Sequence, residues 1–105
     1  MVESKRLAFL QKLTAEGSED PLAWYGLAME LRKLERWDES LQAFNTLRSR
    51  KPDYVPVYLM CGQMLEQLGR VDEAREWLER GIEQADARGD THAKGELESA
   101  LATLE

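Results

Sequence analysis

The sequence is poor in residues that could cross-link a small protein. Its 105 residues include one cysteine, Cys61, and one histidine, His92. A single thiol excludes a disulfide within the chain, and this pair is too small a set for a zinc cage. We therefore expect no metal and no cofactor, and a fold that depends on burying apolar side chains.

Long apolar runs and excess positive charge are also missing. No stretch approaches the roughly 20 residues of a membrane-spanning helix, and residues 1–6 lack the apolar core of a signal peptide. The net charge of -6 argues against a general nucleic-acid binder, because phosphate recognition needs a basic surface. Hydrophobic residues make up 43% and charged residues 32%, which excludes a disordered tail. The composition predicts one soluble, cytoplasmic domain with no nucleic-acid or membrane partner.

What is present is helical periodicity. Proline, glycine and acidic residues divide the chain into six segments, in which apolar residues recur three and four positions apart. No segment shows sustained period-2 alternation, so we predict an all-α fold of about six helices. The predicted N-caps are short polar side chains that accept backbone hydrogen bonds: Ser4, Asp20, Asp38 and Asp72.

A shift of 34 residues superposes two helical pairs. Side chains of similar size and polarity then coincide at the packing positions. The small residues matter most, because they let the two helices of a hairpin approach closely. The aligned pairs are Trp24 with Tyr58, Leu27 with Cys61, Ala28 with Gly62, Leu31 with Leu65, Ser40 with Ala74 and Phe44 with Leu78. A repeat of this length predicts stacked antiparallel helical hairpins.

The pattern resembles the tetratricopeptide repeat family, a superhelix of helical hairpins. The first copy reads Trp24, Leu27-Ala28, Leu31, Ser40, Phe44 and Pro52, and the second reads Tyr58, Cys61-Gly62, Leu65, Gly69, Ala74 and Leu78. The departures are Leu47 in the usual alanine position, Glu35 for the turn glycine and Asp86 for the closing proline. The resemblance implies a half-repeat helix at 4–16, repeats at 21–54 and 55–88, and a capping helix at 90–104.

Apolar side chains beside the packing stripe suggest a binding face. Leu22, Tyr25 and Met29 are spaced i, i+3, i+7, and Pro56, Leu59 and Gln63 follow one repeat later; the last helix offers Asp90, Ala93 and Leu97 in these places. In the family that the chain resembles, first helices line a concave groove that holds peptides. The resemblance thus implies a groove formed by Leu22, Tyr25, Met29, Arg32, Lys33, Leu59, Gln63 and Glu66. The alternatives are that these side chains only widen the core, or that Tyr25 packs on the first helix.

Some members of this family, the carboxylate-clamp co-chaperones, grip the C-terminal carboxylate of a chaperone in that groove, and the resemblance does not extend to them. Tyr25, Met29 and Met60 stand where the clamp needs lysine and asparagine. A partner would therefore be held through apolar and mixed polar contacts.

The charge is unevenly distributed along the chain. The whole net charge of -6 lies in residues 55–105. This acidic half either forms a solvated outer face or steers basic partners.

We interpret the sequence as a non-catalytic interaction module that binds a peptide or helix of an unidentified protein. A first alternative is a homodimer through the end helices, with Leu7, Phe9, Leu10 and Leu13 as the seam. A remote second alternative is an enzyme using Cys61 as nucleophile and His92 as base. Cys61 occupies a packing position, which favours a buried thiol instead.

Overall fold

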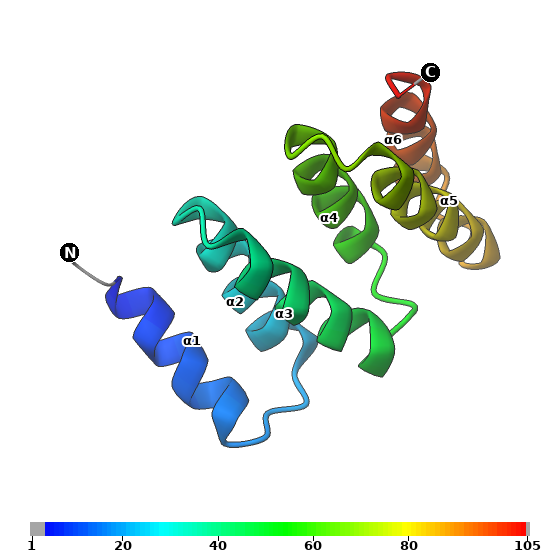
Figure 1. The fold of residues 1–105 in the computed structure, drawn as a ribbon. Coiled ribbons are helices and arrows are strands. Elements are labelled where there is room, and N and C mark those ends of the chain that lie inside the picture. The colour runs from blue at the N-terminus through cyan, green and yellow to red at the C-terminus, as the bar shows by residue number, and fades with distance from the viewer. Residues whose placement is uncertain (1–3, 105) are drawn as a thin grey trace. The chain divides into compact units, whose positions relative to one another are not determined.

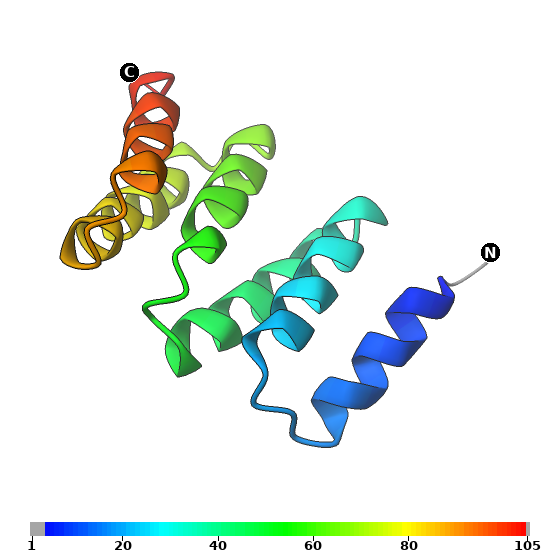
Figure 2. The ribbon, with the colours of Figure 1, turned by 180° about the vertical axis from the view of Figure 1, so that it is seen from behind.

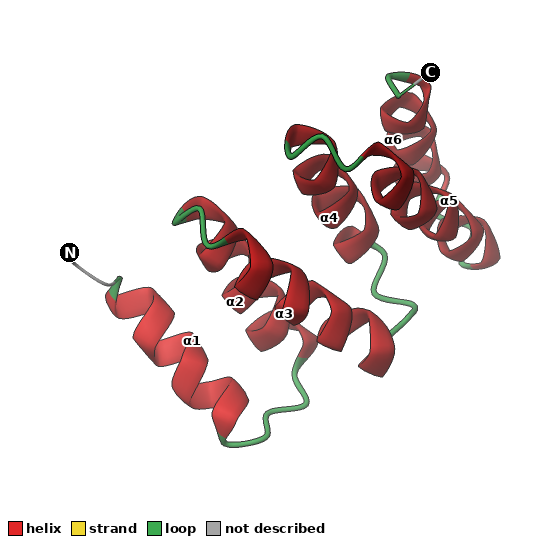
Figure 3. Ribbon diagram, viewed as in Figure 1, coloured by secondary structure: helices red, strands yellow, loops and turns green. Residues whose placement is uncertain are grey.

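The computed structural model describes residues 4–104, in which every regular element is a helix and no strand occurs (Figure 3). The predicted all-α fold with six helices is confirmed. The helices are α1 (Lys5–Ala15), α2 (Pro21–Lys33), α3 (Trp37–Arg50), α4 (Pro56–Gln67), α5 (Val71–Ala87) and α6 (Thr91–Ala102) (Figure 1). They form two compact units, which divide between Lys51 and Pro52. Unit 1 holds α1 to α3 and unit 2 holds α4 to α6.

The first two helices begin at their predicted caps. The N–H of Leu7 donates a hydrogen bond to the hydroxyl of Ser4 over 3.1 Å. The N–H of Leu22 donates to the Asp20 carboxylate over 2.9 Å, and Pro21 occupies the first turn of α2. Each cap satisfies a backbone donor that the helix leaves without an internal partner.

The predicted caps at Asp38 and Asp72 are wrong. Helices α3 and α5 begin before these residues, so both aspartates lie in the first turn, where the helix dipole favours negative charge. Arginines occupy the two cap positions instead. Each pairs with the glutamate three residues later: Arg36 with Glu39 over 2.8 Å and Arg70 with Glu73 over 2.5 Å.

Unit 1 is an antiparallel hairpin of α2 and α3 with α1 packed on α2 (Figures 1 and 2). At the crossing, the buried hydroxyl of Ser40 donates to the carbonyl oxygen of Ala28 over 2.7 Å. Both side chains are fully buried. Because neither extends beyond one heavy atom from Cβ, the two helices can approach closely, as the small-residue pattern predicts.

Unit 2 repeats this hairpin with α4 and α5, and α6 packs on α5. A Cβ built on Gly62 would lie 2.7 Å from the Leu78 side chain. A Cβ on Gly81 would lie 2.5 Å from Cβ of Tyr58 and 2.9 Å from the Leu97 side chain. Gly62 therefore fits α4 against α5, and Gly81 fits α5 against both of its neighbours.

The register predicted for the last helix is wrong. A 34-residue spacing places Leu97 over Gln63, which is exposed, yet Leu97 is a core residue with 1% exposure. Its structural counterpart is the fully buried Cys61, 36 residues earlier. Part of this shift comes from the start of α6: α5 has 17 residues against 14 in α3, and the connection after it is two residues shorter, so Thr91 follows Pro56 by 35 residues. Of the other residues predicted for this face, Asp90 caps α6 by accepting a hydrogen bond from the N–H of Ala93.

The turn after α2 contains a strained residue. Glu35, which replaces the family's turn glycine, has φ of 62°, whereas its counterpart Gly69 has φ of 78°. A residue with a side chain pays about 1–2 kcal/mol to adopt this left-handed conformation, and glycine does not. Glycine is more flexible in the unfolded chain, which offsets part of that advantage.

We therefore expect Glu35→Gly to raise the free energy of unfolding by about 1 kcal/mol. Gly69→Ala is the matched control and should lower the free energy of unfolding by a similar amount. Because nothing lies within 4 Å of the added Cβ, that loss measures the backbone conformation alone. Urea denaturation followed by circular dichroism checks both. A loss of stability in Glu35→Gly would show that the carboxylate, and not the backbone conformation, dominates this turn.

Candidate functional site

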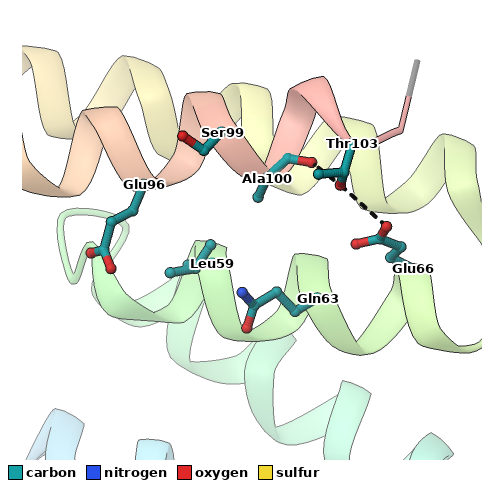
Figure 4. Close-up of a pocket in the computed structure, with 7 residues that line it drawn as sticks. All are labelled: Leu59, Gln63, Glu66, Glu96, Ser99, Ala100 and Thr103. Carbon is teal, nitrogen blue, oxygen red and sulfur yellow. Dashed lines mark hydrogen bonds between the residues drawn. The ribbon is translucent and has the colours of Figure 1, made fainter.

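A groove of about 550 Å³ lies between α4 and α6 in unit 2 (Figure 4). Apolar, amide, hydroxyl and carboxyl groups all contribute to its walls. The lining side chains are Leu59, Gln63 and Glu66 from α4 and Glu96, Ser99, Ala100 and Thr103 from α6.

The α4 wall follows from the amphipathic pattern of that helix. Leu59, Gln63 and Glu66 are spaced i, i+4, i+7 and so share one face. Tyr58 and Cys61, which lie outside this face, are fully buried, and Tyr58 packs on Trp77 and Gly81 of α5. Because Tyr58 and Cys61 pack inside unit 2, the face with Leu59, Gln63 and Glu66 is turned toward the groove. The three groove residues expected from the sequence in this helix therefore do line one cavity.

The α6 wall was not found by sequence analysis. Its four residues lie on a face of the last helix that the 34-residue spacing does not align with the groove residues of α4. A 36-residue spacing, which aligns Leu97 with Cys61, places Ser99 on the groove residue Gln63. Leucine spacing carried part of the signal, since Leu97 is buried and Leu101 half-buried on α6.

A hydrogen bond joins the two walls at one end. The Thr103 hydroxyl donates to the Glu66 carboxylate over 3.2 Å (Figure 4). The same oxygen lies 2.7 Å from the carbonyl of Ala100. This contact holds the Glu66 carboxylate at the rim of the groove.

Two groups outside the groove have shifted pKa values. The Arg70 guanidinium donates hydrogen bonds to the Glu73 carboxylate and lowers its pKa. The Asp86 carboxylate accepts a hydrogen bond from Lys94 over 2.9 Å and raises the pKa of that ammonium group. Both pairs are exposed ion pairs of α5 and α6, so they contribute little to stability.

The other residues expected in the groove lie on α2 in unit 1. Leu22 is 63% exposed, which excludes a role in widening the core. Lys33 is also exposed, and Tyr25, Met29 and Arg32 are half-buried. They share the side of α2 that its packed residues leave uncovered.

Unit 1 also contains a smaller crevice that sequence analysis did not anticipate. Its volume is about 230 Å³, and α1, α2 and α3 all line it. Trp24, Leu27 and Leu31 contribute its apolar part. The Trp24 indole N–H donates to the carbonyl of Ser18 over 2.9 Å, and the Arg50 guanidinium lies 4.9 Å from its ring centre. Both contacts hold the Trp24 ring in place within unit 1.

The seam predicted on α1 is not one exposed surface. Leu7 and Leu10 are buried in unit 1, where α1 packs on α2, and Leu13 is half-buried. Only Phe9 of the four points strongly to solvent, with 60% exposure. A dimer through all four residues would require α1 to leave the hairpin, so that version of the seam is wrong.

Cys61 and His92 do not form an accessible reactive pair. The Cys61 thiol is fully buried, whereas the His92 side chain is 88% exposed and lies 3.5 Å from Glu96. The described residues 4–104 also hold no group of three metal-ligating side chains. In the same range, no helix has both the length and the apolar character needed to cross a bilayer.

Helical hairpins of this geometry, each with a flanking helix, define a helical repeat protein. The family model for the tetratricopeptide repeat matches residues 7–55 and 25–90. The chain belongs to the tetratricopeptide repeat family. Proteins of this family are in general non-catalytic adaptors in protein–protein interaction.

Solved structures agree with this assignment. A tetratricopeptide repeat domain protein from Salinibacter ruber is 36% identical in its solution structure, with a TM-score of 0.79 over 83% of this chain and 88% of that one. A crystal structure of such a protein from the same organism is 34% identical, with a TM-score of 0.75 over 81% and 96%. A Bordetella parapertussis protein, at 24% identity, shares the fold with a TM-score of 0.80 over 98% and 89%. No curated protein sequence matches the chain.

Proposed function

We propose that the chain is a non-catalytic adaptor that binds a peptide or helix of another protein in the groove between α4 and α6. The observation that carries this proposal is the groove itself, with its apolar residues Leu59 and Ala100 set among polar side chains. Concave surfaces that combine apolar contacts with converging polar groups are typical of ligand-binding sites. The partly exposed face of α2, with Leu22 exposed and Tyr25 and Met29 half-buried, offers a second contact surface.

The proposal includes an affinity and a location. A groove built by two short helices contacts only a small area, so we expect dissociation constants of about a micromolar. We place the protein in the cytoplasm, where a lone thiol such as Cys61 stays reduced.

A pull-down from host lysate tests the proposal. We expect Leu59→Ala to retain about tenfold less partner than wild type, because truncating a central apolar contact typically costs at least 1 kcal/mol. Val71→Ala is the matched control, since Val71 is a 38% exposed apolar residue on α5 outside the groove. Tyr25→Ala measures the contribution of α2 separately.

The variants must share the thermal unfolding midpoint of wild type within a few degrees, so that binding and folding are not confused. Equal retention by wild type, Leu59→Ala and Val71→Ala would contradict the groove. Size-exclusion chromatography of Phe9→Ala addresses the alternative of a homodimer, which would shift to the size of a monomer.

A further inference from the structure

We propose that the groove between α4 and α6 selects an extended peptide segment that carries two basic side chains three residues apart. This claim rests on the proposed function and narrows it to one class of partner. Its basis is the position of two carboxylates at opposite ends of the groove, within a unit whose basic side chains are engaged elsewhere.

The two carboxylates mark the ends of the groove. Glu96 lies at one end, beside Leu59, and Glu66 lies at the other, beside Thr103 (Figure 4). Leu59 and Glu66 are seven residues apart on α4, which corresponds to about 10 Å along the helix axis. An extended polyproline-type segment returns to the same face every third residue, about 9 Å further along. Two arginines or lysines with two residues between them therefore match the length of the groove along α4, and their long flexible side chains extend toward the carboxylates on the two walls.

Charge is strongly divided between the units. Residues 52–105 contain 12 acidic and 5 basic side chains, whereas residues 1–51 contain 8 acidic and 9 basic ones. A groove in the acidic unit attracts a cationic segment before contact and accelerates its association.

The basic side chains of unit 2 pair with carboxylates outside the groove. All five of them, over residues 52–104, have such a partner. The pairs are Arg70 with Glu73, Arg75 with Asp72, Arg80 with Glu76, Arg88 with Asp53 and Lys94 with Asp86. None of these five ion pairs uses Glu66 or Glu96. Glu66 accepts a hydrogen bond from the Thr103 hydroxyl over 3.2 Å, and Glu96 lies 3.5 Å from the exposed His92 imidazole. A cationic segment that binds here therefore competes with these two contacts and not with an arginine or lysine ion pair.

The middle of the groove suits the rest of such a segment. The side chains of Leu59 and Ala100 offer apolar contact to the residues between the two basic positions. The amide of Gln63 and the hydroxyl of Ser99 can each donate and accept a hydrogen bond, which the backbone of an extended peptide requires. Apolar contact and charge are thus arranged along one line.

Fluorescence anisotropy with a defined probe tests this inference. The probe is a fluorescein-labelled peptide, Ala-Pro-Arg-Ala-Pro-Arg-Ala-Pro, and its control carries glutamine in place of both arginines. We expect the arginine peptide to bind full-length wild-type protein about tenfold more tightly than the glutamine peptide, because it can form two exposed ion pairs that each contribute about threefold.

A matched pair of double variants separates the groove from the overall charge. Glu66→Gln with Glu96→Gln should weaken binding about tenfold, whereas Glu79→Gln with Glu98→Gln, the same charge change at exposed residues outside the groove lining, should weaken it less than about twofold. Glutamine at position 66 still accepts the Thr103 hydrogen bond, and circular dichroism verifies the fold.

Each outcome decides the inference. Equal losses in the two double variants would overturn it and leave only attraction to a negative protein, as would equal binding of the two peptides. If the arginine peptide fails to bind while Leu59→Ala still loses a partner in the pull-down, the adaptor function stands and the preference for basic segments is wrong. If both fail, the groove itself is not a binding site.

Discussion

Replacing Tyr58 by alanine is expected to lower the free energy of unfolding by about 3–5 kcal/mol, because it empties the largest fully buried position of the core. The Tyr58 ring lies 6.0 Å from the ring of Trp77, and its hydroxyl donates a hydrogen bond to the carbonyl of Pro52. A single domain has only about 5–15 kcal/mol of stability in total. The variant should therefore be close to unfolding at room temperature.

Urea denaturation followed by circular dichroism measures this loss. Tyr58→Phe is the control: it keeps the ring, loses only the hydrogen bond to Pro52, and should cost about 1 kcal/mol. If alanine and phenylalanine cost the same, the hydrogen bond and not the packing of the ring would stabilise this part of unit 2.

Gly81→Ala is the second change with a large expected effect, a loss of about 2–3 kcal/mol. The added methyl would lie 2.5 Å from Cβ of Tyr58, an atom fixed to the backbone of α4, so the two helices must separate. It would also lie 2.9 Å from the Leu97 side chain, which anchors α6. The loss should exceed the gain of about 1 kcal/mol that alanine normally brings to a helix.

Gly95→Ala is the matched control for this overpacking. Gly95 lies inside α6, and nothing comes within 4 Å of its Cβ position. We expect it to gain about 0.5–1 kcal/mol from helix propensity alone. Thermal unfolding of the two variants should therefore shift in opposite directions; a shift in the same direction would show that α5 is packed more loosely than the distances indicate. Gly81→Ala should also weaken peptide binding, because Leu97 positions the α6 wall.

Local rules account for most of what the sequence predicted correctly. The spacing of apolar residues was sufficient to predict the helices. Small residues such as Ser40 and Gly62 were sufficient to predict where two helices cross closely. Each of these features depends on only one or two neighbouring helical turns. The caps at Asp38 and Asp72 failed because an arginine–glutamate pair replaces the side-chain cap at each of these helix starts. The helix dipole stabilises an aspartate both at the N-cap and inside the first turn. The presence of an aspartate therefore does not determine at which residue the helix begins.

The site was only half predictable for a physical reason. The α4 wall follows from the helical phase of Leu59, Gln63 and Glu66, which their own helix determines. The α6 wall depends on where α6 begins. Thr91 follows Pro56 by 35 residues instead of 34, because α5 is three residues longer than α3 and the connection after it is two residues shorter. The proposed seam on α1 failed similarly, since the periodicity of Leu7 and Leu10 shows that a face is buried but not which neighbour buries it.

The central claim, that another protein docks between α4 and α6, is tested most directly by photo-crosslinking in the native host. A benzophenone amino acid is placed separately at Gln63 in the groove, at Glu79 on the exposed side of α5, and at Phe9 on α1. We predict that Gln63 yields a crosslink to another protein and that Glu79 yields none. A crosslink at Phe9 to a second copy of this chain, with none at Gln63, would contradict the account and assign the interaction to α1.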